Sequence, residues 1–547
     1  MTLIGVHDLH KSFGGRAILR GVNLVIGPEA RIGLVGQNGT GKSTLLEILA
    51  GREDGDTGEV TRRRTLCTAY LPQNIPGEAR TPLQFVLAAR PELAELEDEL
   101  VACETALADP AVTGDLRRIE RVLERQERLL RRFEEIGGPG FEGEARSYLR
   151  GLGLDEAAIE QPMAELSGGQ RNLTALAACL AQRPELLLLD EPETHLDLPH
   201  RQYLEALIRD FAGAVVIVSH DRYLLDETIS EVAELDGGVI TLWPGNYSAY
   251  TLAREVALQR QQVVYTAQQK EIARLEEAIA RFKLWASLVP NERHIKQARN
   301  KQRQIDHMEK VERPVLERRK MALELRSAMR GGQKVLELRD VDMAFGENIV
   351  LLGANLLITR GERVGIIGPN GVGKSVLAKL LMGELAPTSG QRWIGPSISL
   401  GYFAQGQETL DPEATPLETI RAARPYYEEQ AVALLGRYLF SYEQARQPIA
   451  TLSGGERSRL QLLLLMLSGD NCLVLDEPTN HLDIASAEVL EGALERYDGT
   501  VIVISHDRYF LDRIVDRVIE VRDGKLVGFE GGYSLWRERQ EAQARAG

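Results

Sequence analysis

The chain has 547 residues, which is too long for one hydrophobic core and predicts several domains. Its composition, 44% hydrophobic and 27% charged, is that of an ordinary globular protein and excludes a collagen-like or wholly disordered chain. The net charge of −15 means that most of the surface repels nucleic acid, so a nucleic-acid partner would need a local basic patch.

The N-terminus and the apolar runs predict a cytoplasmic protein that does not enter a membrane. MTLIGVHDLHKSF at residues 1–13 lacks the apolar core of a signal for export. The most apolar runs, at 463–469 and 501–505, are far shorter than the roughly 20 residues of a membrane helix. Four cysteines lack the paired spacing of a zinc site, an iron–sulfur cluster or a disulfide framework: Cys67, Cys103, Cys179 and Cys472.

An internal repeat organises the chain, because the same landmarks recur in both halves in the same order. In each half, 23 positions separate an aromatic residue from a Gly-rich loop, and 37 separate that loop from a glutamine. An LSGG motif then precedes a strand-ending aspartate by 23 positions, and a histidine follows 30 positions later. One interval differs: 94 positions separate Gln73 from Ser167, but only 48 separate Gln405 from Ser453. The first half therefore carries an insertion of 46 residues.

The insertion falls roughly at residues 83–136, where the pattern predicts a helical hairpin arm that reverses at Asp109-Pro110. A second extra segment, about 251–330, is nearly free of Gly and Pro until Pro290 and predicts a longer hairpin. A break at Pro290-Asn291 would leave two helices of roughly 35 residues, about 50 Å each. The expected domains are two related cassettes and a basic helical-hairpin linker: 1–250, 251–330 and 331–547.

Each half contains a Gly-rich phosphate loop between an apolar strand and a helix, GQNGTGKS at 36–43 and GPNGVGKS at 368–375. The glycines allow backbone N–H groups to surround phosphates, the lysine neutralises phosphate charge, and the serine hydroxyl ligates Mg²⁺. A chance Gly-rich turn is disfavoured because the motif occurs twice. The residues expected to bind nucleotide are Gly36, Asn38, Gly39, Gly41, Lys42, Ser43, Thr44, Gly368, Asn370, Gly371, Gly373, Lys374, Ser375 and Val376.

Two apolar strands end in paired acids, Asp190-Glu191 and Asp476-Glu477. A continuous apolar run is typical of a buried parallel strand, which delivers the acids to its C-terminal edge. We expect the aspartates to hold Mg²⁺ through water, and the glutamates to act as general bases on the attacking water. A structural acid pair is the alternative, which the distance from the phosphate loop disfavours.

LSGGQ at 166–170 and LSGGE at 452–456 each predict the start of a helix. A serine hydroxyl and glycine N–H groups at a helix N-terminus form an anion site. Neither motif can easily reach the phosphate loop of its own half, so each is expected to complete the site of the other half. The residues concerned are Ser167, Gly168, Gly169 and Gln170 in the first motif, and Ser453, Gly454, Gly455 and Glu456 in the second.

His220 and His506 follow strands, where a histidine can hydrogen-bond the γ-phosphate and hold the water and the base in line. Taken alone, each histidine could equally be structural. Gln73 and Gln405 are candidates to contact Mg²⁺ and the attacking water, and a structural glutamine is the alternative.

Phe13 and Phe345 precede the two phosphate loops and are candidates to stack on adenine; burial in the core is the alternative. Together the motifs predict two α/β cassettes. Each would be a mostly parallel sheet around a phosphate loop with a helical subdomain.

The two halves resemble the ABC-F family over the whole chain, through EPETHLD at 191–197, EPTNHLD at 477–483, the SHDRYLLD and SHDRYFLD stretches and GNYSAY at 245–250. The resemblance implies an ATPase with two P-loop ABC cassettes and two inserted α-helical hairpins, the arm and the interdomain linker. It implies ATP and Mg²⁺ as cofactors, a cytoplasmic location without membrane spans, and a monomer whose own cassettes pair.

Most known members of that family bind the ribosome at its tRNA exit region. The resemblance therefore implies a translation factor whose ATP-driven closure sets the linker hairpin against tRNA in the peptidyl or exit site. The arm would approach ribosomal RNA and protein. Two other classes stay open: the ATPase subunit of an importer, although importers with fused cassettes lack a long basic linker, and a DNA-maintenance ATPase, which a basic hairpin would serve equally well.

The chain departs from the family pattern at two places. Glu193 and Thr194 stand where the pattern has Thr and Asn, which adds an acid beside the loop that couples the sites and leaves the activity of that site open. Val376 replaces a usual Thr and removes one hydroxyl contact to the α-phosphate, while the Mg²⁺ ligand Ser375 is kept. Hydrolysis is expected to survive.

The linker is basic, with 16 Lys or Arg against 9 Asp or Glu in residues 251–320. One acid-free cluster suits a phosphate backbone, with a solvated helix face as the alternative: Arg293, Lys296, Arg299, Lys301 and Arg303. The arm has an arginine stripe that could grip RNA or pair with nearby glutamates within the helix: Arg117, Arg121, Arg125, Arg128 and Arg132. Neither hairpin has aromatic residues spaced to stack bases, so recognition by shape and phosphate is expected.

Overall fold

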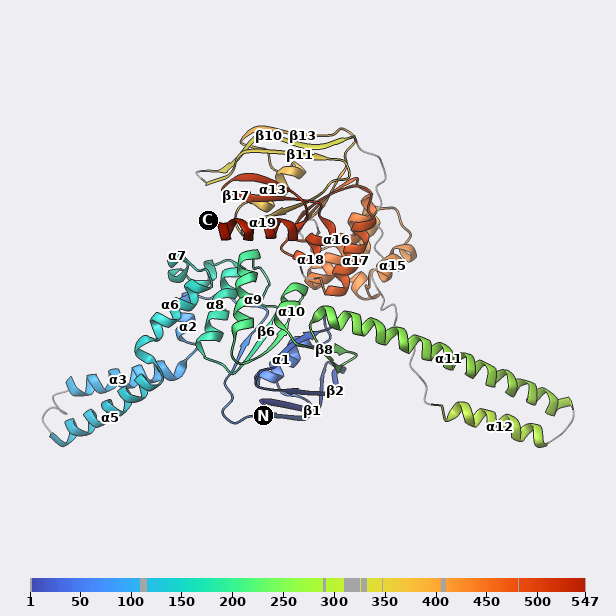
Figure 1. Ribbon diagram of the computed structural model, residues 1–547, viewed down its shortest axis with the longest axis horizontal. Coiled ribbons are helices and arrows are strands. Elements are labelled where there is room, and N and C mark those ends of the chain that lie inside the picture. The colour runs from blue at the N-terminus through green and yellow to red at the C-terminus, as the bar shows by residue number, and fades with distance from the viewer. Residues whose placement is uncertain are drawn as a thin grey trace.

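A computed structural model shows two cassettes, one above the other, with two helical hairpins that project in opposite directions (Figure 1). The structure describes residues 2–108, 116–288, 292–308, 325, 332–346, 348–404, 410–480 and 482–546. The predicted α/β fold class is confirmed, with both inserted hairpins present.

The first cassette is built on a six-stranded sheet whose order is β5-β6-β7-β3-β8-β9. The first five strands are parallel, and β9 pairs antiparallel to β8 at the edge. The central strand β6 is buried along its whole length, as its run of leucines predicts for a strand covered on both faces. The strands are β3 (Arg31–Val35), β5 (Thr68–Leu71), β6 (Leu186–Asp190), β7 (Ala214–Val218), β8 (Glu231–Asp236) and β9 (Val239–Pro244).

A three-stranded antiparallel sheet covers one face of this cassette in the order β2-β1-β4. It packs with α1 (Lys42–Ala50) and the central strands into one hydrophobic cluster. A second cluster on the other face joins the sheet to the helical subdomain. The elements are β1 (Ile4–Phe13), β2 (Arg16–Ile26), β4 (Thr57–Arg62), α2 (Pro82–Leu87), α6 (Phe141–Gly151), α7 (Glu156–Glu160), α8 (Gly168–Ala181), α9 (Leu198–Asp210) and α10 (Arg222–Thr228).

The second cassette repeats this plan, with a six-stranded sheet in the order β14-β15-β16-β12-β17-β18 and a three-stranded sheet in the order β11-β10-β13. The two halves, whose motifs are equally spaced in the sequence, therefore have the same strand order in both of their sheets. Its strands are β10 (Lys334–Phe345), β11 (Asn348–Thr359), β12 (Arg363–Ile367), β13 (Ser389–Ile394), β14 (Leu400–Phe403), β15 (Cys472–Asp476), β16 (Thr500–Ile504), β17 (Arg517–Arg522) and β18 (Lys525–Glu530). Its helices are α13 (Lys374–Met382), α14 (Pro416–Ala423), α15 (Glu428–Arg437), α16 (Gly454–Ser468), α17 (Ile484–Arg496), α18 (Arg508–Ile514) and α19 (Tyr533–Ala546).

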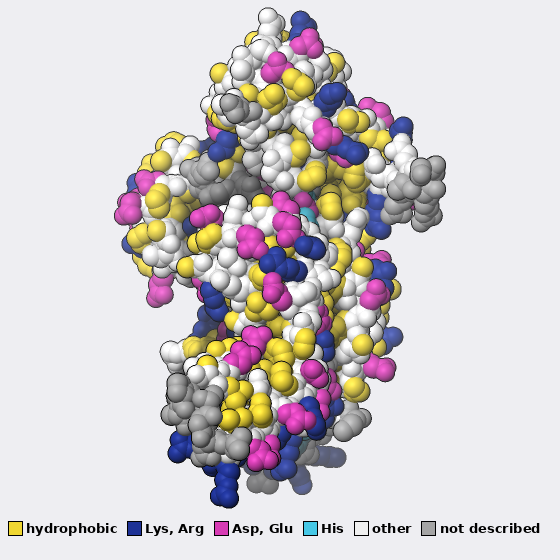
Figure 2. Space-filling model, turned by 90° about the vertical axis from the view of Figure 1, so that its left-hand side faces the viewer, with side chains coloured by type: hydrophobic (Ala, Val, Ile, Leu, Met, Phe, Trp, Pro, Cys, Tyr) yellow, Lys and Arg dark blue, Asp and Glu magenta, His cyan; other side chains and the backbone are white. Residues whose placement is uncertain are grey.

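The arm consists of α3 (Pro91–Ala108) and α5 (Leu116–Glu135), which lie side by side at the lower left of Figure 1. The expected reversal at Asp109-Pro110 lies outside the described residues. Within the stripe, Arg125 pairs with Glu99 of α3 across the hairpin at 2.8 Å. Figure 2 shows acidic and basic side chains interspersed on the face that carries the arm, which gives the arm no single-sign field.

The linker consists of α11 (Tyr247–Leu288) and α12 (Glu292–Asp306), and the expected break at Pro290-Asn291 lies between them, outside the described residues. The expectation of two helices of roughly 35 residues is wrong, because α11 has 42 residues and α12 has 15. The first helix begins early because Tyr247 and Tyr250 are buried in the core of the first cassette. The second packs against α11 through Ala298 and Ile305, and Met308 just after the helix packs against the same cluster.

The base of α11 is held firmly to the first cassette. Tyr250 packs against Trp243 of β9 with ring centroids 5.9 Å apart, and Arg254 pairs with Glu234 of β8 at 2.7 Å. Among the described residues, no helix has both the length and the apolar character to cross a membrane.

Candidate active site

Both phosphate loops connect a central strand to a helix, β3 to α1 and β12 to α13, as the motifs predict. Each loop bends back at a glycine in the left-handed region, with φ of 99° at Gly41 and 102° at Gly373. A Cβ atom would lie 2.3 Å from Ile18 Cγ2 at the first glycine and 2.2 Å from Val350 Cγ1 at the second. Only glycine fits such a position, so the backbone geometry explains the sequence.

The two loop lysines are buried against the loops that carry them. Lys42 Nζ donates to the carbonyl oxygens of Gly36 at 2.9 Å and Gln37 at 3.1 Å. Lys374 Nζ makes the same contacts to Gly368 and Pro369, both at 2.8 Å. Burial lowers the pKa of both lysines, although neighbouring carboxylates oppose the shift. An ammonium held this way is available to any phosphate that the loop surrounds.

The acid pairs end β6 and β15, as predicted, and both glutamates have a strained backbone. Glu191 has a φ of 49° and Glu477 a φ of 51°, in the left-handed region that residues other than glycine rarely adopt. Each N–H donates at 2.8 Å to the end of the next strand, to Val218 and Ile504 respectively. The turn holds each carboxylate at the strand edge that faces its phosphate loop.

In the first site, Glu191 lies between a glutamine and a histidine. Gln73 Nε2 donates to Glu191 Oε2 at 2.8 Å, and His220 Nε2 lies 3.3 Å from Glu191 Oε1. Burial acts to raise the pKa of Glu191, but these partners and Lys42 outweigh it and hold the pKa below its ordinary value. Burial raises the pKa of Asp190 to about 6, although the hydroxyl of Ser43 opposes the shift.

The second site differs in its electrostatics. His506 Nε2 lies 3.6 Å from Glu477 Oε1, which is longer than a hydrogen bond, and the backbone N–H of His506 donates to Glu477 Oε2 at 3.3 Å. Burial raises the pKa of Glu477 to about 7 and lowers the pKa of His506 well below its ordinary value. Gln405, the expected counterpart of Gln73, lies outside the described residues.

Both LSGG motifs begin a helix, α8 and α16, as predicted. Ser167 caps α8 by accepting from the N–H of Gln170 at 3.2 Å, and Ser453 caps α16 by accepting from the N–H of Glu456 at 3.3 Å. The glycines allow close packing, since a Cβ atom at Gly169 would lie 2.6 Å from the carbonyl oxygen of His195. The first motif therefore lies directly against the loop that contains His195.

The same loop crosses to the other cassette. The N–H of Asn370, in the second phosphate loop, donates to Asp197 Oδ2 at 3.0 Å, and its side chain donates to the carbonyl oxygen of His195 at 3.0 Å. On the other side, the N–H of Asn38 donates to Asp483 Oδ2 at 3.5 Å. Each candidate site therefore includes residues from both cassettes. The repeated HLD after each acid pair, part of the family pattern, is the local signal that marks this loop in the sequence.

A second set of contacts, absent from the sequence-based prediction, joins the cassettes through the residues after the histidines. Arg222 pairs with Glu491 of the second cassette, and Arg508 pairs with Glu205 of the first. All four side chains are buried. Between the two pairs, the rings of the adjacent tyrosines, Tyr223 and Tyr509, meet edge to face with centroids 5.2 Å apart. We call these six residues the arginine clasp: Glu205, Arg222, Tyr223, Glu491, Arg508 and Tyr509.

The remaining predicted residues lie around the phosphate loops. Phe13 ends β1 and Phe345 ends β10; they are 49% and 50% exposed, so the alternative of burial in the core is wrong. Val376 packs partly buried against the core of the second cassette, beside Ser375 at the start of α13. Thr44 occupies the matching position at the start of α1.

The chemistry of the first site fits Mg²⁺. A carboxylate at the end of β6 and a hydroxyl at the start of α1 are hard oxygen donors, which is the ligand type that Mg²⁺ prefers. Among the described residues, no group of three His, Cys, Asp or Glu could hold a metal by itself.

The phosphate loops, strand-ending acids and LSGG helices, arranged across two facing cassettes, define a tandem P-loop ATPase of the ABC type. A family profile described as ABC transporter matches residues 19–194 and 351–480, and a second with the same description matches residues 233–325.

Relatives match over nearly the whole chain. The ATP-binding protein YdiF of Bacillus subtilis is 35% identical over 99% of this chain and 84% of its own length. ABC transporter F family member 5 of Arabidopsis thaliana is 35% identical over 98% of this chain and 77% of its own length. The chain belongs to the ABC-F family, and it is an ATPase.

Solved structures share the fold at low identity. The RNase-L inhibitor has a TM-score of 0.63 at 19% identity and covers 98% of this chain and 93% of its own. The archaeal ribosome recycling factor aABCE1, solved with a ribosomal stalk protein, has a TM-score of 0.62 at 18% identity and covers 98% and 92%.

Proposed function

We propose that this ATPase is a translation factor, in which closure of the cassettes on ATP sets the angle of the linker hairpin against ribosome-bound tRNA. One observation carries the proposal: a continuous helix, α11, connects the core of the first cassette to a basic hairpin end. Motion of the cassette therefore reaches the hairpin without an intervening flexible joint. The family membership and the similar fold of the archaeal ribosome recycling factor also support a role in translation.

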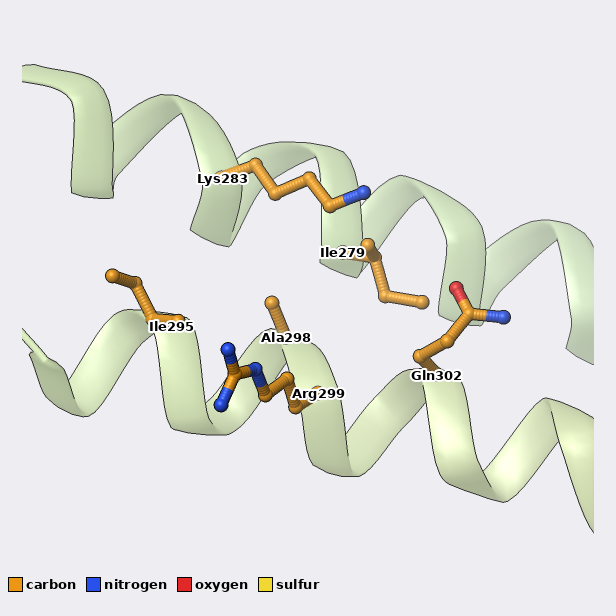
Figure 3. Close-up of a pocket in the computed structure, with 6 residues that line it drawn as sticks. All are labelled: Ile279, Lys283, Ile295, Ala298, Arg299 and Gln302. Carbon is orange, nitrogen blue, oxygen red and sulfur yellow. The ribbon is translucent and has the colours of Figure 1, made fainter.

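The charge of the linker suits folded RNA. Lys296, Arg299 and Arg303 are exposed on α12, and the chain as a whole has a net charge of −15. Near the hairpin end, Lys283 of α11 and Arg299 of α12 border a groove of about 400 Å³ whose floor is Ile279 and Ala298 (Figure 3). Cations from both helices of the hairpin therefore offer phosphate contacts along one groove.

The site residues have the following proposed roles in hydrolysis. Glu191 and Glu477 polarise the attacking water, and His220 and His506 hold the water and γ-phosphate in line. The nucleotide on each phosphate loop is completed by the LSGG motif of the opposite cassette. Phe13 and Phe345 are proposed to stack on adenine, which their exposure permits.

Mg²⁺ would be held by Ser43 and Asp190 in the first site and by Ser375 and Asp476 in the second, with Gln73 and Gln405 beside it. When bound, it neutralises charge on the β- and γ-phosphates.

A sedimentation experiment tests the proposed function. The Glu191→Gln, Glu477→Gln variant, incubated with ATP and cell lysate, is expected to co-migrate with ribosomes in a sucrose gradient. The glutamines block hydrolysis and so retain the ATP-bound form. Migration at the top of the gradient, or tighter binding to branched DNA than to ribosomes, would contradict the proposal.

A charge variant of the same chain tests the role of the linker. With Lys296, Arg299 and Arg303 all replaced by Ala, the log–log dependence of ribosome affinity on salt should lose a slope of about 3, one unit per phosphate contact. The matched control replaces three exposed cations outside the linker, Arg209, Arg522 and Lys525, and should leave the slope unchanged. An equal loss in both variants would show that the effect is one of net charge.

A further inference from the structure

Glu193 is the one position of the EPETHLD loop where the first cassette buries an acid that the second cassette lacks. The position matches Thr479 in the second cassette. Glu193 lies three residues after the strand-ending Asp190, and its side chain is only 5% exposed. A buried acid is costly unless its oxygens are used, so its contacts identify its purpose.

One oxygen of Glu193 gathers three donors from the histidine loop, residues 219–221. Glu193 Oε1 accepts from Ser219 Oγ at 2.6 Å, from the N–H of His220 at 2.8 Å and from the N–H of Asp221 at 3.3 Å. The N–H of Asp221 also donates to Ser219 Oγ at 2.9 Å, which ties the loop to itself. The carboxyl group thus fixes the backbone on both sides of the catalytic histidine.

The second cassette holds its histidine loop differently. There the N–H of His506 donates to Glu477 Oε2 at 3.3 Å, so the backbone uses the proposed base itself as its acceptor. In the first cassette that donor goes to Glu193, and Glu191 accepts instead from Gln73 at 2.8 Å and lies 3.3 Å from His220 Nε2. The acid at 193 therefore leaves both oxygens of Glu191 to side chains of the reaction site.

The loop that carries Glu193 is itself fixed from its other side. Asn172 of α8 donates from Nδ2 to the carbonyl oxygens of Pro192 at 2.7 Å and Thr194 at 3.3 Å. The matching residue of the second cassette is Ser458, whose shorter side chain carries no amide. Glu193 is thus held on a rigid support between the LSGG helix and the histidine loop.

We propose that Glu193 is a positioning residue of the first ATP site: it holds the histidine loop so that His220 and Glu191 meet in the arrangement needed for hydrolysis. The inference rests on the proposed roles of Glu191 and His220 and requires nothing of the ribosome. It predicts that the acid raises the rate of ATP hydrolysis at the first site. Because Glu193 departs from the family pattern, the sequence alone had left the activity of that site open.

A neutral acceptor should serve as well as the acid. Burial, with Asp221 and Glu191 nearby, raises the pKa of Glu193, which disfavours its charged form. The carbonyl oxygen of a glutamine can accept the same three hydrogen bonds, whereas a threonine at this position is too short to reach them. Glu193→Gln and Glu193→Thr therefore separate the geometry from the mere presence of a polar residue.

The test measures ATP hydrolysis by the full-length chain without ribosomes, with every variant made in a Glu477→Gln background so that only the first site turns over. Glu193→Thr is expected to lower kcat by between about 10- and 100-fold, because small displacements of catalytic groups have effects of that size. KM for ATP should stay within about twofold, since the phosphate loop is untouched. Glu193→Gln should keep at least half of kcat, and Thr479→Ser serves as the matched control, with no change.

Three outcomes would overturn the proposal: an unchanged kcat in Glu193→Thr, an equal loss in Glu193→Gln, or a rise in KM that accounts for the whole effect. Glu191→Gln is measured in parallel. If that variant keeps its turnover, the proposed role of the base fails; if it loses turnover while Glu193→Thr does not, only the positioning role fails.

Discussion

Replacing Glu191 and Glu477 together by glutamine is expected to lower ATP turnover by between about 10² and 10⁴-fold, the range associated with loss of a general base. A glutamine keeps the shape of the side chain but cannot take a proton from water. ATP binding should persist, because the phosphate loops and their lysines are unchanged. The measurements are phosphate release and retention of labelled ATP on gel filtration.

Lys42→Ala with Lys374→Ala provides the control for that result, because it removes the ammonium groups proposed to bind phosphate and should abolish retention of ATP itself. The single variants add information about the two sites. Glu191 is held by Gln73 and His220 with a lowered pKa, whereas burial raises the pKa of Glu477 to about 7. Turnover by the double variant at the rate of the unmodified chain would show that neither glutamate is the base.

Removing one arginine of the clasp should have the second large effect. Arg508→Ala would leave Glu205 buried without its partner and would weaken the contact to Asp221, whose carboxylate lies 3.7 Å away. Breaking a buried ion pair from one side costs about 3–5 kcal/mol. The melting temperature should fall by roughly 10 °C for a cassette of this size. ATP turnover should fall about tenfold or more, because the sites need both cassettes.

A double variant distinguishes the ion pair from packing. Arg508→Met with Glu205→Leu replaces both charges by apolar groups and should recover most of the lost stability, since such replacements of buried pairs are often neutral. The exposed pair of the arm, Arg131 with Glu127, is the control, and Arg131→Ala should cost less than about 1 kcal/mol. If Arg508→Ala were equally mild, the clasp would not be what holds the cassettes together.

The sequence predicted the cassettes and the place of each motif on its strand or helix, because each motif is a local pattern with a physical purpose. A glycine at position 41 is required by a backbone φ of 99°, and four leucines before Asp190 are required by a doubly covered strand. Such requirements can be recognised in a single stretch of chain. Because the chain is an internal repeat, the same motifs could be recognised in both cassettes.

Contacts between the cassettes were beyond that reasoning, because they depend on which surfaces face each other. Nothing local in Arg508 indicates that its partner lies 303 positions earlier, at Glu205. The length of α12 was overestimated for a similar reason. Absence of Gly and Pro permits a helix but does not set its length, and α12 ends at Asp306.

The early start of α11 has a mechanical consequence. With Tyr247 and Tyr250 of its first turn buried in the first cassette and 42 residues in one piece, the helix is about 63 Å long from its base to its far end. A rotation of the first cassette by about 10° would carry its far end through about 11 Å, roughly the diameter of a helix. The helix would thus act as a lever, whose length would turn a small angular change at the nucleotide into a displacement large enough to move a neighbouring molecule.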